Sequence, residues 1–207
     1  MAVDYTLYLV ADADYAGGRD LAGLIDAAVE GGVTIVQLRA KNLAGGAFVE
    51  LGLKVAGRLA ARGVPLFIND RLDIAMACGA AGVHLGQGDL PVPLARRLLG
   101  PYATIGVSAN TPEEARRAER EGANYIGAGP AYPTVTKETA LAVLGPLGIG
   151  LIKRSTGLPV VAIGGIDAGN APEIARAGAD GIAVVSAILG SPDARKAAVE
   201  LKKAFNG

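Results

Sequence analysis

The segments EGGVTIVQL (30–38), CGAAGVHLG (78–86), EGANYIGAG (121–129) and AGADGIAVV (177–185) repeat one pattern along the chain. In each segment, the end of an amphipathic stretch is followed by glycine and then by a short apolar run. Glycine supplies the left-handed conformation that ends many helices, and a continuous apolar run suits a parallel strand covered on both faces. Each segment is therefore a joint between a helix and a strand, and its repetition predicts alternating helices and parallel strands.

The same alternation extends over the whole sequence. Strands are expected at Leu7–Val10, Ile35–Leu38, Leu66–Asn69, Val83–Leu85, Thr104–Val107, Tyr125–Ala128, Val160–Ile163 and Ile182–Val185. Helices are expected between them, for example at Leu21–Glu30, Phe48–Arg62, Pro112–Glu121 and Pro172–Ala177. Eight strand–helix units without a remainder for a second domain favour a single-domain (β/α)8 TIM barrel over residues 1–207 rather than an open doubly wound sheet.

Composition narrows the classes of partner. Twenty basic residues balance twenty acidic ones, so no overall charge attracts nucleic acid or an anionic membrane. Apolar runs such as Leu158–Ile166 are too short to span a bilayer, and the first residues lack the positively charged start of a secretory signal. We therefore expect a soluble, cytoplasmic protein that binds small molecules, with a homo-oligomer left open. The single cysteine, Cys78, is expected to be a buried apolar side chain rather than a catalytic thiol.

Polar residues follow the second expected strand on one of its faces. In Gln37-Leu38-Arg39-Ala40-Lys41, strand alternation places Gln37, Arg39 and Lys41 on one side and Leu38 on the other. Inward positions of a barrel are crowded, so an amide and two cations there would be costly without an anionic ligand. The pattern favours an anion site over a solvated strand end.

Two carboxylates follow the next two strands. Asp70 comes after the third strand and Asp89 after the fourth. Each could cap the helix that follows it, but together they offer the hard oxygen donors that suit Mg²⁺ bridging substrate phosphates. His84, the single histidine, lies within an apolar strand and is expected to be a hydrogen-bonded wall residue rather than a general base.

The later strands are followed by further phosphate-binding candidates. The long loop after the sixth strand carries Thr134, Thr136 and Lys137, which can donate to phosphate oxygens. Gly164-Gly165 follows the seventh strand and Val185-Ser186 the eighth, where barrels often bind phosphate through backbone N–H groups. The sequence thus predicts one anion site with cations and a metal, and a second built mainly from backbone.

The chain resembles the thiamine phosphate synthase family over nearly its whole length. The matching segments are VQLRAK (36–41), FINDR (67–71), GVHLGQGDL (82–90), IGVS (105–108), GPAYPTVTK (129–137) and AIGGI (162–166). The resemblance implies that a pyrimidine carrying a diphosphooxymethyl group loses pyrophosphate to give a pyrimidine cation. The nitrogen of a thiazole phosphate, free or carboxylated, then captures that cation.

The resemblance also implies a role for each matching residue. Pyrophosphate is expected at Arg39, Lys41, Asn69, Thr134, Thr136 and Lys137, Mg²⁺ at Asp70 and Asp89, the pyrimidine at Gln37 and Ser108, and the thiazole phosphate at Thr134, Thr136, Gly165, Val185 and Ser186. Within this set, catalysis is expected to depend on Arg39, Lys41, Ser108 and Lys137.

Two positions depart from the family pattern, and they bear on the alternatives. Asn110 stands where many relatives have histidine, and Asn124 replaces a common aspartate. The related thiazole tautomerase relies on a histidine in this region, so Asn110 argues against that activity. A phosphosugar isomerase or epimerase would need a general base and a monophosphate site, but not Asp70, Asp89 and Lys137 together. A catalytically idle phosphate sensor would not need every polar contact of the family, and this chain retains them, which argues against an idle protein.

Overall fold

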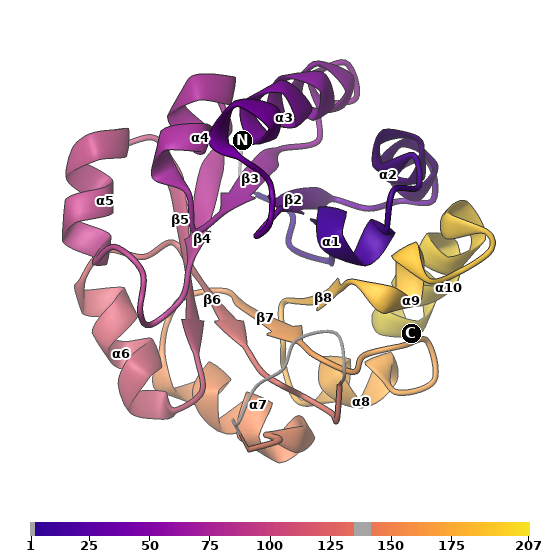
Figure 1. Cartoon of the computed structure of the whole chain (residues 1–207). Coiled ribbons are helices and arrows are strands. Elements are labelled where there is room, and N and C mark those ends of the chain that lie inside the picture. The colour runs from indigo at the N-terminus through magenta and orange to yellow at the C-terminus, as the bar shows by residue number, and fades with distance from the viewer. Residues whose placement is uncertain (1–2, 135–141) are drawn as a thin grey trace.

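The computed structural model describes residues 3–134 and 142–207, which form a closed ring of parallel strands surrounded by helices (Figure 1). The strands pair in chain order and the last pairs with the first. They are β1 (Leu7–Asp12), β2 (Ile35–Arg39), β3 (Leu66–Asn69), β4 (Gly82–Leu85), β5 (Thr104–Ala109), β6 (Tyr125–Ala128), β7 (Val160–Ile163) and β8 (Gly181–Val184). The predicted TIM barrel is confirmed.

Helices follow the strands around the ring. They are α1 (Ala13–Ala16), α2 (Leu21–Glu30), α3 (Gly45–Ala60), α4 (Leu72–Cys78), α5 (Val92–Leu99), α6 (Pro112–Arg120), α7 (Gly145–Ser155), α8 (Ala171–Arg176), α9 (Ser186–Leu189) and α10 (Ala194–Asn206). The expected bounds of α2 match the observed ones, and those of α3, α6 and α8 differ from them by at most three residues. At the start of α6, the Thr111 hydroxyl accepts a hydrogen bond from the N–H of Glu114, and the Glu114 side chain accepts one from the N–H of Thr111.

Side chains of each strand alternate between the barrel interior and the surrounding helices. On β1, Leu7 and Leu9 belong to the core beneath the helices, whereas Tyr8 and Val10 belong to a separate cluster inside the barrel. The predicted alternation on β2 is also observed, since Leu38 lies in the helix-facing core. Cys78 is buried in that core, as expected.

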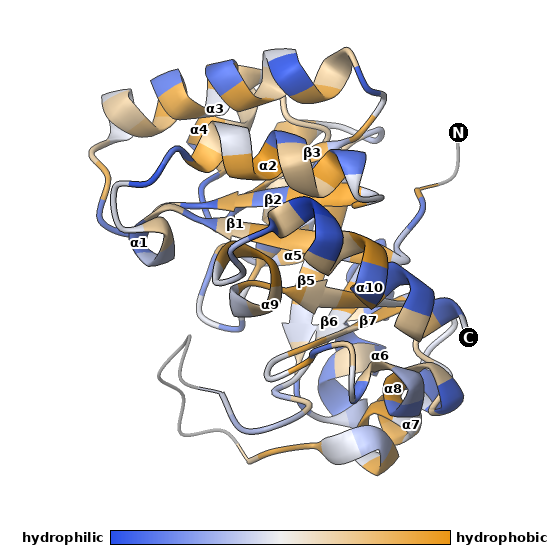
Figure 2. Cartoon of the chain, turned by 90° about the vertical axis from the view of Figure 1, so that its right-hand side faces the viewer, coloured by the Kyte–Doolittle hydropathy of each residue, from blue (hydrophilic) through white to orange (hydrophobic). Residues whose placement is uncertain are grey.

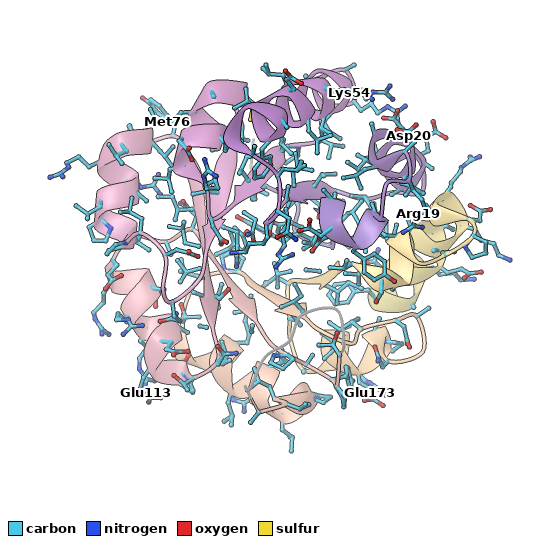
Figure 3. The ribbon with its side chains drawn as sticks, viewed as in Figure 1. Arg19, Asp20, Lys54, Met76, Glu113 and Glu173 are labelled. Atoms are coloured by element: carbon cyan, nitrogen blue, oxygen red, sulfur yellow. The ribbon has the colours of Figure 1, made fainter. Side chains whose placement is uncertain are left out.

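The outer surface of the helical ring carries hydrophilic residues together with exposed apolar side chains such as Leu53 and Leu147. Figure 2 shows apolar residues along the strands and on the helix faces that cover them, with hydrophilic residues on the outer faces. Lys54 on α3 and Glu113 on α6 point away from the barrel in Figure 3. Among the described residues, no helix combines the length and apolar character that a membrane span requires.

Aromatic rings fill the barrel interior below the strand ends. Tyr8, Phe67 and Tyr125 form this aromatic plug, with ring centroids 5.9–6.0 Å apart. The Tyr125 ring leaves no room for a side chain at position 106 of β5, because a Cβ at Gly106 would lie 2.0 Å from that ring. The plug therefore closes one half of the interior and leaves the half near the carboxyl ends of the strands for other side chains.

Gly106→Ala should destabilise the protein by about 1–3 kcal/mol, because the added methyl group overpacks the interior. The matched substitution Gly57→Ala lies on exposed α3 with open space around its Cβ. It should instead stabilise the protein by about 0.5–1 kcal/mol, since alanine has the better helix propensity. Urea unfolding of both variants measures the difference. Equal stability of the two variants would contradict the packing described for the plug.

Candidate active site

The carboxyl ends of the strands surround a cavity of about 180 Å³ above the aromatic plug. Every strand contributes at least one residue to its lining, and Tyr8 and Tyr125 of the plug face it from below. Barrel enzymes build their active sites at this end because each strand can offer a different side chain there. The cavity is therefore the candidate active site.

The structure brings most of the predicted site residues together. Those that line the cavity are Gln37, Arg39, Asn69, Ser108, Thr134, Gly165, Val185 and Ser186. Three predicted residues lie beside the cavity: Lys41, Asp70 and Asp89. The N–H of Asp70 donates a 2.9 Å hydrogen bond to the carbonyl of His84, which lines the cavity. Thr136 and Lys137 lie outside the described residues, so their roles stay predictions.

Both cations predicted at the end of β2 are paired with carboxylates. Arg39 donates to Asp12, a residue only 3% exposed at the end of β1, and Lys41 donates to Asp70. The Arg39 ion pair uses one terminal nitrogen, and the rest of a guanidinium's five N–H donors can still meet a phosphate. The Lys41 side chain is 52% exposed, so its pair with Asp70 is weak enough to yield to a more highly charged anion.

Asp70 and Asp89 lie close enough for their carboxyl groups to interact. Burial raises the pKa of Asp89, and the neighbouring Asp70 carboxyl raises it further. Burial also acts upward on the pKa of Asp70, but hydrogen bonds with Lys41 and Asp89 outweigh it and leave that pKa lowered. The negative charge of Asp70 thus disfavours ionisation of Asp89, and a divalent cation between the two carboxylates would offset their repulsion.

The helix-cap alternative for these two carboxylates is wrong. The residues that cap α4 and α5 are Arg71 and Pro91, and neither cap makes a side-chain hydrogen bond. Asp89 instead accepts from the backbone N–H of Gly86 at 2.6 Å. Asp70 has φ 60, the left-handed conformation, and is alone in this among the non-glycine residues that the structure describes. Such backbone strain is typical of functional positions.

The donor set fits Mg²⁺. Both side chains offer hard oxygen ligands, and within residues 3–134 and 142–207 no cluster of three or more metal-ligating side chains occurs. Mg²⁺ commonly binds through one or two carboxylates and completes its shell with water and substrate phosphates. Asp70 and Asp89 would therefore hold the ion only together with a phosphate-bearing ligand.

A chain of hydrogen bonds runs beneath the cavity from β2 to β5. Gln37 Nε2 donates to the Tyr8 hydroxyl (2.8 Å), which bonds to the Tyr125 hydroxyl (2.8 Å). Tyr125 contacts His84 Nδ1 (2.9 Å), and His84 Nε2 contacts the Ser108 hydroxyl (3.0 Å). The expectation of a hydrogen-bonded wall histidine is confirmed, and burial raises the pKa of both tyrosines, so their hydroxyls remain protonated.

The opposite wall is made of backbone and small side chains. Gly164 and Gly165 have φ of 100° and 64°, conformations that favour glycine, and Ser186 begins α9. A Cβ at Gly165 would lie 2.5 Å from the carbonyl oxygen of Pro133. Glycine at this position is therefore required by loop packing.

Sequence reasoning missed three residues of this site. Asp12 was missed because the first strand was expected to end at Val10, whereas β1 continues for two more residues. Tyr8 and Tyr125 lie within expected strands, where the local sequence gives no sign that their hydroxyls meet across 117 positions. Asn110, which differs from the histidine common in the family, also lines the cavity, and its side-chain amide donates to the Gly129 carbonyl.

Known proteins resemble this chain over its full barrel. A family model described as thiamine monophosphate synthase matches residues 7–188. A thiamine-phosphate synthase of Albidiferax ferrireducens is 50% identical, with 95% of this chain and 90% of the relative covered. One from Chloroflexus aurantiacus is 46% identical, with coverages of 97% and 92%.

Solved structures agree with this similarity. A thiamine phosphate pyrophosphorylase from Pyrococcus furiosus superposes with a TM-score of 0.90 at 37% identity, covering 99% of this chain and 96% of that one. An orotidine 5'-phosphate decarboxylase from Pyrococcus horikoshii shares only the fold, with a TM-score of 0.71 and 18% identity over 98% of this chain and 100% of that one.

Asp89→Asn should remove Mg²⁺ binding without destabilising the metal-free protein, because it relieves the repulsion from Asp70 and keeps an acceptor for Gly86. With pyrophosphate present, Mg²⁺ at about a hundredfold excess over its Kd should stabilise the wild type by about 2.7 kcal/mol and the variant by far less. Thermal unfolding measures this. Asp73→Asn, an exposed neighbour paired with Arg71, is the control and should respond like the wild type. A full Mg²⁺ response in Asp89→Asn would contradict the metal site.

Proposed function

Since this chain belongs to the thiamine monophosphate synthase family and is a transferase, we propose that it joins 4-amino-2-methyl-5-(diphosphooxymethyl)pyrimidine to 4-methyl-5-(2-phosphoethyl)thiazole and releases pyrophosphate. The observation that carries this proposal is the division of one cavity into two unlike walls. Charged groups lie at the ends of β1 to β4, and a neutral glycine turn with a helix start lies at β7 and β8. Two phosphorylated substrates need two such places.

Pyrophosphate binds on the charged wall. Arg39 and Lys41 give up part of their contact with Asp12 and Asp70 to the phosphate oxygens, and Asn69 donates from the end of β3. Thr134 donates from the neighbouring loop, and the sequence adds Thr136 and Lys137 to the same group. Mg²⁺ held by Asp70 and Asp89 would neutralise charge that accumulates on the departing pyrophosphate.

The pyrimidine ring lies between the walls, above Tyr8 and Tyr125. The bond from its methylene carbon to oxygen breaks, and the electron pair leaves with pyrophosphate. The exocyclic amino group shares the positive charge that remains on the pyrimidine. The thiazole nitrogen then donates its lone pair to the methylene carbon and becomes positively charged. No proton has to be removed, so the reaction needs charge stabilisation rather than a general base, which suits a histidine held between Tyr125 and Ser108.

The thiazole phosphate binds on the neutral wall. The first N–H groups of a helix have no partner within the helix, so the start of α9 at Ser186 offers donors beside the Gly164-Gly165 turn. Val185 packs beside the thiazole ring at the same place. Binding by backbone and hydroxyl donors holds a monophosphate without placing a second cation near the developing pyrimidine cation.

The direct test is incubation of the purified protein with both substrates and Mg²⁺, followed by chromatography for thiamine phosphate and an assay for pyrophosphate. Both products should form in equal amounts. Lys41→Ala should lower kcat by about a hundredfold, because stabilisation of developing charge is lost. Lys54→Ala, on the outer face of α3, is the matched control and should leave kcat unchanged. Absence of product with the wild type would refute the proposal.

Ser186→Ala should raise the KM for the thiazole phosphate by about tenfold, the effect of one lost hydrogen bond to a charged group. The KM for the pyrimidine pyrophosphate should stay within a factor of about two, because that substrate binds on the other wall. This substitution is preferable to one at Gly165, where a side chain would strike Pro133 and disturb the loop. A two-substrate kinetic series makes the comparison, and equal changes in both constants would show that the two walls are wrongly assigned.

A further inference from the structure

Gln37, Tyr8, Tyr125, His84 and Ser108 are linked in this order by hydrogen bonds. We propose that they form a positioning network that fixes which end of the cavity accepts a hydrogen bond and which end donates one. The site would thereby select a 4-aminopyrimidine over its 4-oxo counterpart. Tyr8, Tyr125 and His84 are positioning residues in this network, because they act through the two end residues. The inference rests on the proposed function and specifies how its pyrimidine site discriminates.

The network is continuous and largely buried. Its four contacts measure 2.8–3.0 Å, and Tyr8 and Tyr125 are 1% and 0% exposed. Its members come from β2, β1, β6, β4 and β5, so it crosses the interior rather than following neighbouring strands. Only the two end residues have polar atoms to spare for a ligand in the cavity, since the hydroxyls and ring nitrogens between them contact one another.

The number of hydrogens along the network determines its direction. Gln37 donates through Nε2, so the Tyr8 oxygen accepts and the Tyr8 hydrogen goes to Tyr125. The Tyr125 hydrogen then goes to His84 Nδ1, which must be the unprotonated nitrogen. His84 Nε2 therefore carries the ring proton and donates it to the Ser108 oxygen.

Mixed directions are unfavourable. If His84 donated from Nδ1 while Gln37 donated to Tyr8, one tyrosine hydroxyl would hold a hydrogen without an acceptor among its described contacts, in a buried place. Turning the Gln37 amide would instead reverse every donor in the network together. The tautomer of His84 consequently reports the chemical character of both ends.

In the direction set by Gln37, the two ends are opposite in character. Gln37 has Oε1 left to accept a hydrogen bond, besides its second Nε2 hydrogen, and Ser108 has its hydroxyl hydrogen left to donate one. A 4-aminopyrimidine has an amino donor on one side of its ring and an acceptor nitrogen across from it, so it satisfies both. A 4-oxo ring places an acceptor opposite Gln37 Oε1, and two acceptors repel. The Gln37 acceptor also favours the transition state, because the amino N–H groups become stronger donors as charge develops on the ring.

The tautomer can be measured directly because the chain has a single histidine. Selective ¹⁵N-histidine labelling of the untagged protein gives one imidazole, and its two nitrogen shifts distinguish Nε2–H from Nδ1–H and from the imidazolium. We expect the Nε2–H form, both in the free protein and with thiamine phosphate, which carries the same aminopyrimidine. Either of the other forms would overturn the inference.

Specificity is measured with unreactive ligands, so that binding is separated from chemistry. The ligands are the monophosphates of the 4-amino and the 4-oxo hydroxymethylpyrimidine. In the wild type, the inhibition constant of the 4-amino form should be about a hundredfold lower than that of the 4-oxo form. Tyr125→Phe and Tyr8→Phe each remove one network oxygen and should reduce this preference by about tenfold. Tyr5→Phe is the matched control, because its ring packs 5.0 Å from that of Tyr125 but lies outside the network, and it should keep the full preference.

The outcomes separate this inference from the proposed function. If the wild type forms thiamine phosphate but both network variants keep the wild-type preference, the network has no positioning role and the inference fails alone. If the wild type forms no product, the proposed function fails first. Folding of each variant is checked by circular dichroism. If Tyr125→Phe does not fold, the preference of Tyr8→Phe and the tautomer of His84 test the inference.

Discussion

Closure of the strands around Tyr8, Phe67 and Tyr125 is the packing constraint on which the rest of the structure depends. The rings fill one half of the barrel, and glycine at position 106 of β5 gives Tyr125 the space it needs. Because the plug stops below the strand ends, the remaining half of the interior stays open as a cavity of about 180 Å³. The same tyrosines turn their hydroxyls toward Gln37 and His84, so that one set of side chains both packs the barrel and provides the polar floor of the site.

Electrostatics divides the site that this packing creates. Arg39 and Lys41 are held by Asp12 and Asp70, and the Asp70 carboxyl lies beside that of Asp89. These charges are positioned before any ligand binds, which is the condition under which charged groups stabilise a transition state most effectively. The wall at β7 and β8 has glycines and Ser186 instead. A positively charged intermediate formed between the walls would meet cations on one side only, where the departing pyrophosphate lies.

Much of this arrangement could be predicted from the sequence, because apolar runs and glycine joints report directly on parallel strands and helix ends. The eight strands and the shared face of Gln37 and Arg39 were predictable for that reason. Asp12 was not, since the strand continues beyond its apolar run. The contact between Tyr8 and Tyr125 was not predictable either, because nothing local in the sequence links two residues that meet only after barrel closure. The sequence left Asp70 and Asp89 open between helix caps and metal ligands, and the helix starts at neighbouring residues exclude the caps.

The central claim is that one cavity holds two phosphate groups on chemically different walls. A crystal structure of the protein with thiamine phosphate, pyrophosphate and Mg²⁺ tests it most directly. The account predicts pyrophosphate against Arg39 and Lys41, Mg²⁺ between that pyrophosphate and the carboxylates of Asp70 and Asp89, and the thiamine monophosphate group against Gly165 and Ser186. Exchanged positions of the two anions, or a metal ion bound away from both carboxylates, would contradict the account.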